Sequence, residues 1–306
     1  MEKDKGKSVS RRAFLKGTTA GIAAMALPPV EPANASFWEA FLQEHFVELN
    51  KDELNKVIAR LKEEYQKKYD VSFNIKTTPA IPGKLFGYGL DLSRCIGCRR
   101  CVYACVKENN QSIEPQIQWI SVLRFERGLH GVSELEEATM YYNPDKVPEK
   151  DFFYMPVQCQ QCEHPPCVKA CPTQATWQEP DGIVVVDYNW CIGCRYCMAA
   201  CPYNARRFNW GEPFRKKEDF NTNCHYLGNR PRFKGVVEKC TFCIQRTREQ
   251  PGRYPACVEI CPVGARKFGD LNDPNSEINY CIKHQRVFRL KEDINTSPKF
   301  FYFFSI

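Results

Sequence analysis

The stretch that decides the fold of this chain runs from Gln158 to Asn204 and reads QCQQCEHPPCVKACPTQATWQEPDGIVVVDYNWCIGCRYCMAACPYN. It contains two groups of four cysteines, each followed by proline. Group two is Cys159, Cys162, Cys167 and Cys171, and group three is Cys191, Cys194, Cys197 and Cys201. Between the groups, the β-branched run from Gly182 to Asp187 predicts a short strand.

This spacing is typical of cysteines that bind iron-sulfur clusters. Three closely spaced thiolates surround one cuboidal cluster, while the fourth leaves on a helix and binds the neighbouring cluster. Gly193 in the CIGC segment lets the backbone approach inorganic sulfide, and Pro172 and Pro202 redirect the chain after the distant ligand. The two groups together predict a bacterial-type ferredoxin unit that holds two 4Fe-4S clusters.

Two further groups repeat the first two. Group one is Cys95, Cys98, Cys101 and Cys105, and group four is Cys240, Cys243, Cys257 and Cys261. The segment DLSRCIGCRRCVYAC at 91–105 matches DYNWCIGCRYCMAAC at 187–201, and PACVEICPVGA in group four matches PPCVKACPTQA in group two. We therefore predict an α+β fold, a duplicated bacterial-type ferredoxin with long loop insertions and an N-terminal helical arm, and a strand over 86–92 that introduces group one.

The short connection between groups two and three places them in one ferredoxin unit, so groups one and four form the other. The second unit is then inserted into the first. Exchange of the fourth ligand within each unit predicts four cluster-binding sets. These are Cys95/Cys98/Cys101/Cys261, Cys240/Cys243/Cys257/Cys105, Cys159/Cys162/Cys167/Cys201 and Cys191/Cys194/Cys197/Cys171. Val106 replaces the proline after Cys105, which weakens the turn argument there but leaves the ligand assignment unchanged.

Other uses of so many cysteines fit the pattern less well. Sixteen of the eighteen cysteines fall in four tight groups, which a disulfide framework does not require. Zinc knuckles also use Cys-x2-Cys pairs, but they do not call for the additional Cys-x3-Cys-Pro. The sequence contains no Cys-x-x-Cys-His, so covalent c-type haem is not supported.

Residues 1–35 resemble a twin-arginine export signal. Ser10-Arg11-Arg12-Ala13-Phe14-Leu15-Lys16 precedes a weakly apolar stretch, and Ala33-Asn34-Ala35 provides small residues for cleavage. The alternative is a basic tail whose paired arginines have no role. We expect export of the folded protein to the periplasm, where it would lie peripherally on the cytoplasmic membrane.

The formal charge of the whole chain is +7. Without residues 1–35, 37 basic and 33 acidic residues remain, a net charge of +4. Each oxidised cluster with four thiolates contributes about −2, so four clusters would bring the protein to about −4. The charge therefore does not suggest a nucleic-acid partner.

The remaining boundaries follow from composition. Residues 36–84 predict a helical arm, with Asn50 or Asp52 as the cap of its second helix, and then a linker with Pro79, Pro82 and Gly83. The arm packs either on its own domain or on a partner. The first ferredoxin unit takes 85–158 and 203–270 and the second takes 159–202. Residues 271–306 form a C-terminal extension whose final KFFYFFSI, too short for a membrane anchor, we expect to pack on a neighbouring subunit.

From about Tyr88 to Asp270 the chain resembles the iron-sulfur subunits of the complex iron-sulfur molybdoenzyme family. That family includes polysulfide, tetrathionate and dimethyl sulfoxide reductases, and related subunits serve sulfite-reduction-linked membrane complexes, periplasmic hydrogenases and alternative complex III. The segments that carry the match are CEHPPCVKACPTQAT, DGIVVVD, CIGCRYCMAACPYNAR, VVEKCTFC, PACVEICP and GDLNDPNSEI. The resemblance implies a periplasmic electron-transfer subunit with four clusters between a membrane quinone-binding subunit and a catalytic, molybdopterin-containing subunit.

Residues outside the four groups offer no separate catalytic constellation. The five histidines are scattered, and His164 is expected beside a cluster or on the surface rather than as a ligand. Cys224 and Cys281 are interpreted as buried unliganded thiols, with a mutual disulfide as the alternative. The aromatic insertion 106–156 and the basic, aromatic insertion 203–239 are expected to cover clusters, to dock partners, or both.

The sequence therefore predicts an electron-transfer subunit rather than a self-contained enzyme. Two alternatives stay open: a free-standing multi-cluster carrier, and a zinc-bound structural or nucleic-acid-binding protein. About sixteen iron atoms per chain, with matching acid-labile sulfide, would separate the first two from the third.

Overall fold

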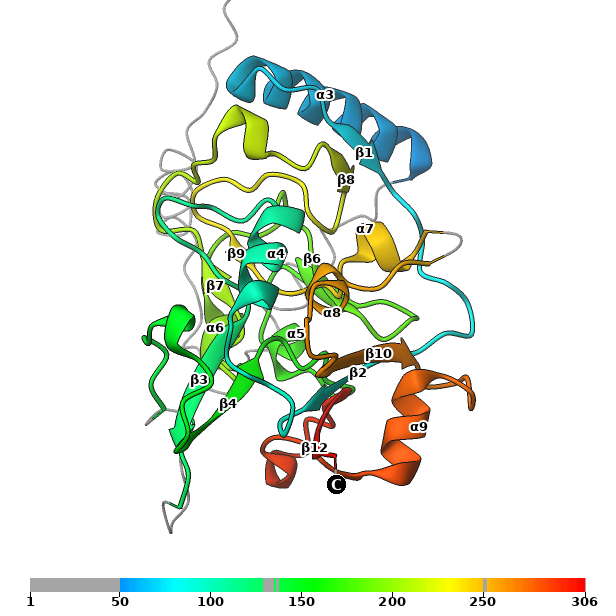
Figure 1. Ribbon diagram of the computed structural model, residues 1–306. Coiled ribbons are helices and arrows are strands. Elements are labelled where there is room, and N and C mark those ends of the chain that lie inside the picture. The colour runs from blue at the N-terminus through cyan, green and yellow to red at the C-terminus, as the bar shows by residue number, and fades with distance from the viewer. Residues whose placement is uncertain (1–49, 129–134, 136–137, 250–251, 306) are drawn as a thin grey trace, which may run out of the picture. The chain divides into compact units, whose positions relative to one another are not determined.

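Short helices and short strand pairs alternate along the chain (Figure 1). The computed structural model describes residues 50–128, 135, 138–249 and 252–305, so the predicted export signal and the first arm helix lie outside the described residues. The helices are α3 (Lys51–Tyr69), α4 (Arg100–Glu108), α5 (Pro166–Lys169), α6 (Tyr196–Ala199), α7 (Ile244–Thr247), α8 (Ala256–Glu259) and α9 (Glu277–His284). The strands are β1 (Asn74–Lys76), β2 (Phe86–Asp91), β3 (Ser121–Glu126), β4 (Phe152–Val157), β5 (Thr176–Gln178), β6 (Val184–Val186), β7 (Arg207–Phe208), β8 (Asn223–His225), β9 (Val237–Glu238), β10 (Arg266–Asp270), β11 (Arg286–Phe288) and β12 (Phe300–Phe304).

Each cysteine group lies between a strand that precedes it and a strand that follows it, and these strands pair in order around the molecule. The antiparallel pairs are β2 with β10, β3 with β4, β5 with β6, and β7 with β9. Helix α4 of group one packs on α8 of group four, and α5 of group two packs on α6 of group three. The α+β architecture expected for a duplicated ferredoxin is therefore present.

Proline decides where the cysteine-bearing helices end. Helices α5, α6 and α8 end two residues before the cysteine that precedes a proline, because proline lacks the amide hydrogen that would continue the helix. Helix α4 has Val106 at the equivalent position, and it continues through Cys105 to Glu108. The missing proline thus lengthens this helix by about one turn.

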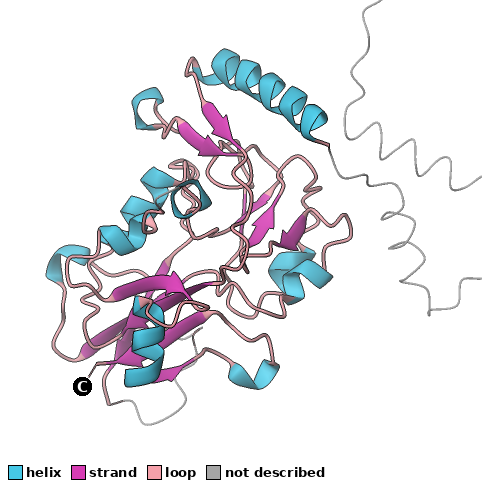
Figure 2. Ribbon diagram, turned by 90° about the vertical axis from the view of Figure 1, so that its right-hand side faces the viewer, coloured by secondary structure: helices cyan, strands magenta, loops and turns pink. Residues whose placement is uncertain are grey.

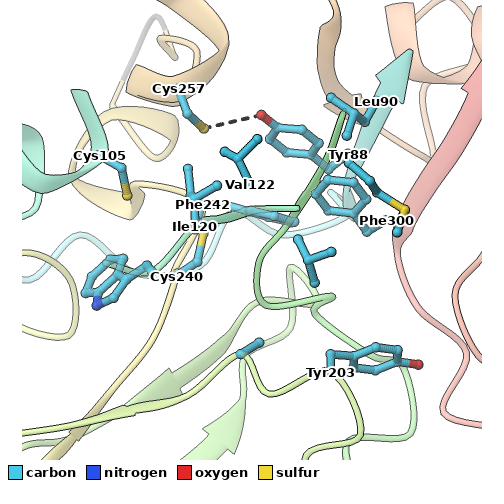
Figure 3. Packing of buried hydrophobic residues seen from close by; sticks show 14 of the residues in the cluster. Tyr88, Leu90, Cys105, Ile120, Val122, Tyr203, Cys240, Phe242, Cys257 and Phe300 are labelled. Carbon is cyan, nitrogen blue, oxygen red and sulfur yellow. Dashed lines mark hydrogen bonds between the residues drawn. The ribbon is translucent and has the colours of Figure 1, made fainter. Parts of the chain in front are cut away.

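The prediction for the last residues was wrong. We expected KFFYFFSI to pack on a neighbour, but β12 lies in the chain's own four-stranded sheet, whose order is β10-β2-β12-β11. Strand β12 pairs parallel with β2, and Phe300 and Tyr302 are completely buried. The Phe300 ring stacks on Tyr88 with ring centroids 4.6 Å apart (Figure 3). An apolar end segment of this kind contributes to the core of its own domain because that sheet has a place for it.

Helix α3 forms the predicted arm and lies on its own domain. It is the long helix beside β1 and β8 (Figure 2). Asn50 caps it as expected, accepting from the backbone N–H groups of Asp52 and Glu53 in a capping box. Its apolar face joins a core cluster with Phe73, Cys224 and other residues, and the Tyr65 hydroxyl donates to the carbonyl of Pro231. The expected linker contains β1, which pairs parallel with β8 and was not anticipated.

No helix in the described ranges has both the length and the apolar character needed to cross a bilayer. Cys224 and Cys281 are buried free thiols, as expected for cysteines outside the four groups. His164 is exposed.

His225 gives a prediction for the dependence of stability on pH. Its ring is buried, with Nε2 2.9 Å from the Thr78 carbonyl oxygen and Nδ1 accepting from the Leu227 N–H. Burial lowers the pKa of His225 from 6.5 to about 4. Because the unfolded chain takes up this proton first, the folded state should lose about 3 kcal/mol of stability as the pH falls from about 6.5 to about 4.

The measurement is the apparent melting temperature against pH for the wild type and for His225→Gln. The variant, although less stable at neutral pH, should show a smaller decrease over that interval. His284→Gln, at an exposed histidine, serves as the control and should follow the wild-type profile. Parallel profiles for wild type and His225→Gln would contradict the assignment.

Candidate functional site

The structure brings the sixteen grouped cysteines together in the four predicted sets, which we call sites A to D. Site A is Cys95, Cys98, Cys101 and Cys261; site B is Cys240, Cys243, Cys257 and Cys105; site C is Cys159, Cys162, Cys167 and Cys201; site D is Cys191, Cys194, Cys197 and Cys171. One pocket is lined by all four cysteines of site A, and a second by all four of site D. Group one thus meets group four, and group two meets group three.

Sites B and C are recognised by the mutual influence of their thiols. Burial raises the pKa of Cys105 well above its usual range, and the nearby Cys243, Cys240 and Cys257 raise it further. Burial likewise raises the pKa of Cys162 to about 12, reinforced by Cys159, Cys167 and Cys201. Without a bound metal these thiols would keep their protons at neutral pH, so cluster assembly must release them.

The CIGC loops of sites A and D have the same backbone conformation. Gly97 and Gly193 have φ values of 71° and 75°, and Arg99 and Arg195, which follow the second cysteine of each loop, have φ values of 57° and 67°. A Cβ on Gly193 would lie 2.3 Å from the Gly235 carbonyl oxygen, and one on Gly97 would lie 2.3 Å from the Tyr154 ring. Only glycine fits these turns, which hold two cysteines toward one centre.

Matching aspartates fix these loops to the rest of the fold. Asp91 and Asp187 each accept from the backbone N–H two residues later, at 3.0 and 2.8 Å. Their own N–H groups donate to the carbonyls of Ala265 and Ala175, both at 2.8 Å. The aspartate that registers in the sequence repeat is therefore a structural anchor of the cysteine loop.

Within the described residues, no three Cys, His, Asp or Glu side chains converge closely enough to share one metal ion. In a cuboidal 4Fe-4S cluster each thiolate binds a different iron, so the four sulfurs stand apart around the cube. Donor atoms directed at the sulfurs complete the environment. Gln111 Nε2 donates to Cys105 Sγ at 3.0 Å, and the Val237 N–H donates to Cys191 Sγ at 3.5 Å. Four thiols with such donors fit the cluster that the spacing predicts.

The sites follow one another in the order A, B, C, D. Cys101 of site A and Cys257 of site B interact electrostatically. Cys240 of site B interacts in the same way with Cys159 of site C. Cys167 of site C in turn influences Cys197 of site D. A continuous series of neighbouring sulfurs thus passes through the protein.

Burial differs along this series. All four cysteines of site B are between 3 and 5 % exposed. The cysteines of site A are all partly exposed, as are Cys171, Cys191 and Cys194 of site D. Exposed apolar side chains lie on and near the site D loop, namely Ile192, Tyr196 and Trp210, each more than 60 % exposed. The middle of the series is covered, and both ends are more open.

The two long insertions contribute mainly to this cover. Trp119 is buried and donates through Nε1 to Glu238, and Arg232 pairs with the same carboxylate at 2.6 Å. Arg230 pairs with Asp187 at 3.3 Å, and Tyr154 is almost completely buried. Much of the basic and aromatic character seen in the sequence is therefore internal, while Tyr141 and Trp210 remain exposed.

Sequence analysis missed several side chains that contact the sulfurs. Arg206 Nη2 donates to Cys167 Sγ at 3.0 Å, and Arg266 Nη2 donates to Cys101 Sγ at 3.1 Å. Burial opposes the charge of both guanidinium groups, but the neighbouring cysteine sulfurs outweigh it and raise both arginine pKa values. The shared segment Cys-Pro-x-x-Ala-Arg in groups three and four is the signal that could have found them.

Comparisons with known proteins agree with these four sites. Family models described as 4Fe-4S dicluster domains match residues 94–175, 150–232 and 215–271. The chain is 42 % identical over 217 residues to a protein of Halobacterium salinarum described as an iron-sulfur subunit of dimethyl sulfoxide reductase, covering 71 % of this chain and 78 % of the relative. It is 38 % identical to an iron-sulfur subunit of the Hdr-like menaquinol oxidoreductase of Archaeoglobus fulgidus, with 70 and 81 % covered. It is 37 % identical to a chain of the polysulfide reductase of Wolinella succinogenes, with 71 and 93 % covered.

Proposed function

Since the protein belongs to the family of iron-sulfur electron-transfer subunits of respiratory reductase complexes, we propose that it conducts electrons along sites A to D between two partner subunits. It is an electron-transfer subunit and does not catalyse a reaction on its own. The two dicluster domains and the cysteine content fit four 4Fe-4S clusters. A cluster bound at each site supplies reversible one-electron transfer.

The ligand sets of sites A to D are part of this proposal. They are supported by the convergence of four cysteines at each site and by the donors that contact their sulfurs. We also propose the nested domains, with 85–158 and 203–270 around the second unit at 159–202. The packing of α4 on α8 and of α5 on α6 supports that division. Residues 1–35, 36–84 and 271–306 remain the proposed signal, arm with linker, and C-terminal extension.

One observation carries the proposal: the series of neighbouring sulfurs passes from a partly exposed site A, through a buried site B, to a partly exposed site D. Electrons can enter at one end and leave at the other, while protein excludes water from the middle. Exposed Ile192, Tyr196 and Trp210 at site D offer apolar area for a partner subunit.

The proposed partners are a polytopic membrane subunit that reacts with quinone and a catalytic subunit that contains molybdopterin. Relatives named as menaquinol oxidoreductase, dimethyl sulfoxide reductase and polysulfide reductase subunits support this pairing. We further propose that Arg11 and Arg12 direct export by the twin-arginine route, so that the subunit works in the periplasm, peripherally on the cytoplasmic membrane.

The experiment is affinity purification of the chain from its native membranes, followed by identification of the accompanying polypeptides and metals. We expect about sixteen iron atoms and matching sulfide per chain, together with a membrane subunit and a molybdenum-containing subunit. A soluble, partner-free iron protein would indicate a free-standing carrier, and zinc in place of iron would overturn the proposal. In a parallel fractionation, replacing Arg11 and Arg12 by lysine should retain the protein in the cytoplasm.

A further inference from the structure

Arg206 and Arg266 are buried cations without a carboxylate partner among the residues that the structure describes. They are 2 and 3 % exposed. The other buried arginines of this core behave differently, since Arg232 pairs with Glu238 and Arg248 pairs with Asp181. A buried charge needs a compensating charge or it becomes very costly. For Arg206 and Arg266 the negative groups in contact are cysteine sulfurs.

Arg266 lies between sites A and B. Its Nη2 donates to Cys101 Sγ of site A at 3.1 Å, and its Nη1 donates to the Tyr88 hydroxyl at 2.9 Å and to Gln158 Oε1 at 3.0 Å. The Tyr88 hydroxyl is 3.3 Å from Cys257 Sγ of site B, as the dashed line in Figure 3 shows. Because a guanidinium can only donate, the tyrosine oxygen accepts from Arg266 and its hydrogen is available to Cys257.

Arg206 occupies the equivalent place between sites C and D. Its Nη2 donates to Cys167 Sγ of site C and to Thr176 Oγ1, both at 3.0 Å. The charge of Cys197 in site D also acts on it. Its Nη1 is buried and has no hydrogen-bond partner in the protein. This unpaired donor shows that the side chain is not held there to satisfy protein acceptors alone.

The sequence places the two arginines identically. Each is the fifth residue after the last cysteine of its own site, Arg206 after Cys201 and Arg266 after Cys261. The corresponding residues of sites D and B are the neutral Thr176 and Asn110. The positive charge therefore belongs to one site in each ferredoxin unit.

We propose that Arg206 and Arg266 tune the redox properties of the row, each raising the reduction potential of the site whose sulfur it contacts, C and A respectively. The proposal rests on the proposed function of these cysteines as cluster ligands. Accepting one electron makes a site more negative by one charge, and a fixed guanidinium at 3 Å stabilises that state more than the oxidised one. Burial preserves this effect because solvent does not screen the charge.

The test is a potentiometric titration of the purified holoprotein, monitored by electron paramagnetic resonance, for the wild type, Arg266→Gln and Arg206→Gln. In Arg266→Gln the ratio of reduced to oxidised site A at a fixed potential should fall about tenfold or more, which is roughly 59 mV for a one-electron couple. Sites C and D should titrate as in the wild type. Arg206→Gln should give the reciprocal result, with site C lowered and sites A and B unchanged.

Lys267→Gln is the matched control. It removes one positive charge from the neighbouring residue of β10, whose side chain pairs with Glu277 at 2.8 Å and contacts no grouped cysteine. All four midpoints should remain at wild-type values in this variant. Arg266→Lys, which keeps the charge but not the forked donor, should lower site A less than Arg266→Gln does.

The outcomes separate this inference from the proposed function. A wild type that binds no iron would overturn the function itself. A wild type with four clusters whose site A midpoint is unchanged in Arg266→Gln would overturn only the role of the arginine. If Arg266→Gln does not retain its iron, Arg266→Lys and Tyr88→Phe decide: a lowered site A midpoint in the first and a lowered site B midpoint in the second support the proposal, and wild-type midpoints in both overturn it.

Discussion

Replacing Cys240 by alanine is expected to remove the cluster at site B and to stop electron transfer along the row. Cys240 is 5 % exposed, and its sulfur lies among those of Cys243 and Cys257, so no water or exposed side chain is at hand to replace it. The iron content should fall from about sixteen to about twelve atoms per chain. Because site B lies between sites A and C, quinol-dependent reduction of the catalytic partner should fall to background.

Cys224→Ala and Cys281→Ala provide matched controls, because both residues are buried thiols outside the four sites. They should keep full iron content and electron transfer even where they lower stability. The measurements are iron and acid-labile sulfide per chain, with electron paramagnetic resonance of the reduced protein. A Cys240→Ala protein that retains four 4Fe-4S signals would show that site B is wrongly assigned.

Replacing Glu238 by alanine is expected to cause the largest loss of stability by a substitution away from the cysteines. Glu238 is completely buried, and its carboxylate accepts from Trp119 at 2.8 Å, from Asn209 at 2.7 Å and from Arg232 at 2.6 Å. Its removal leaves the Arg232 charge buried without a partner. The cost of such a change is about 3–5 kcal/mol, which corresponds to a decrease in melting temperature on the order of 10 °C.

Arg60→Ala is the control for this prediction. It breaks an ion pair with Glu64 on the exposed face of α3, where both side chains are more than half exposed. The effect should be within about 0.5 kcal/mol, since surface pairs contribute little. Thermal unfolding followed by far-ultraviolet circular dichroism and by bleaching of the visible absorbance measures both variants. Equal melting temperatures for Glu238→Ala and Arg60→Ala would contradict the electrostatic account of this core.

The local parts of the fold could be predicted because they depend on residues close in sequence. The strand before group one, the cap at Asn50 and the helical arm are present where the pattern indicated. The strands β1 and β12 were missed, because each forms only by pairing with a segment far away, β8 and β2 respectively. A tail of aromatic residues looks the same in sequence whether it covers a partner or completes the chain's own sheet.

The sequence by itself determined that four groups of thiols gather in pairs, because the spacing within each group and the repeat between groups restrict which cysteines can share a site. Only the tertiary structure decided the order of the sites, the burial of site B and the placement of Arg206 and Arg266 against sulfur. The reason is physical. Thiolate spacing acts over a few covalent bonds, whereas the electric field and the dryness of each site arise from side chains that approach through packing of distant segments.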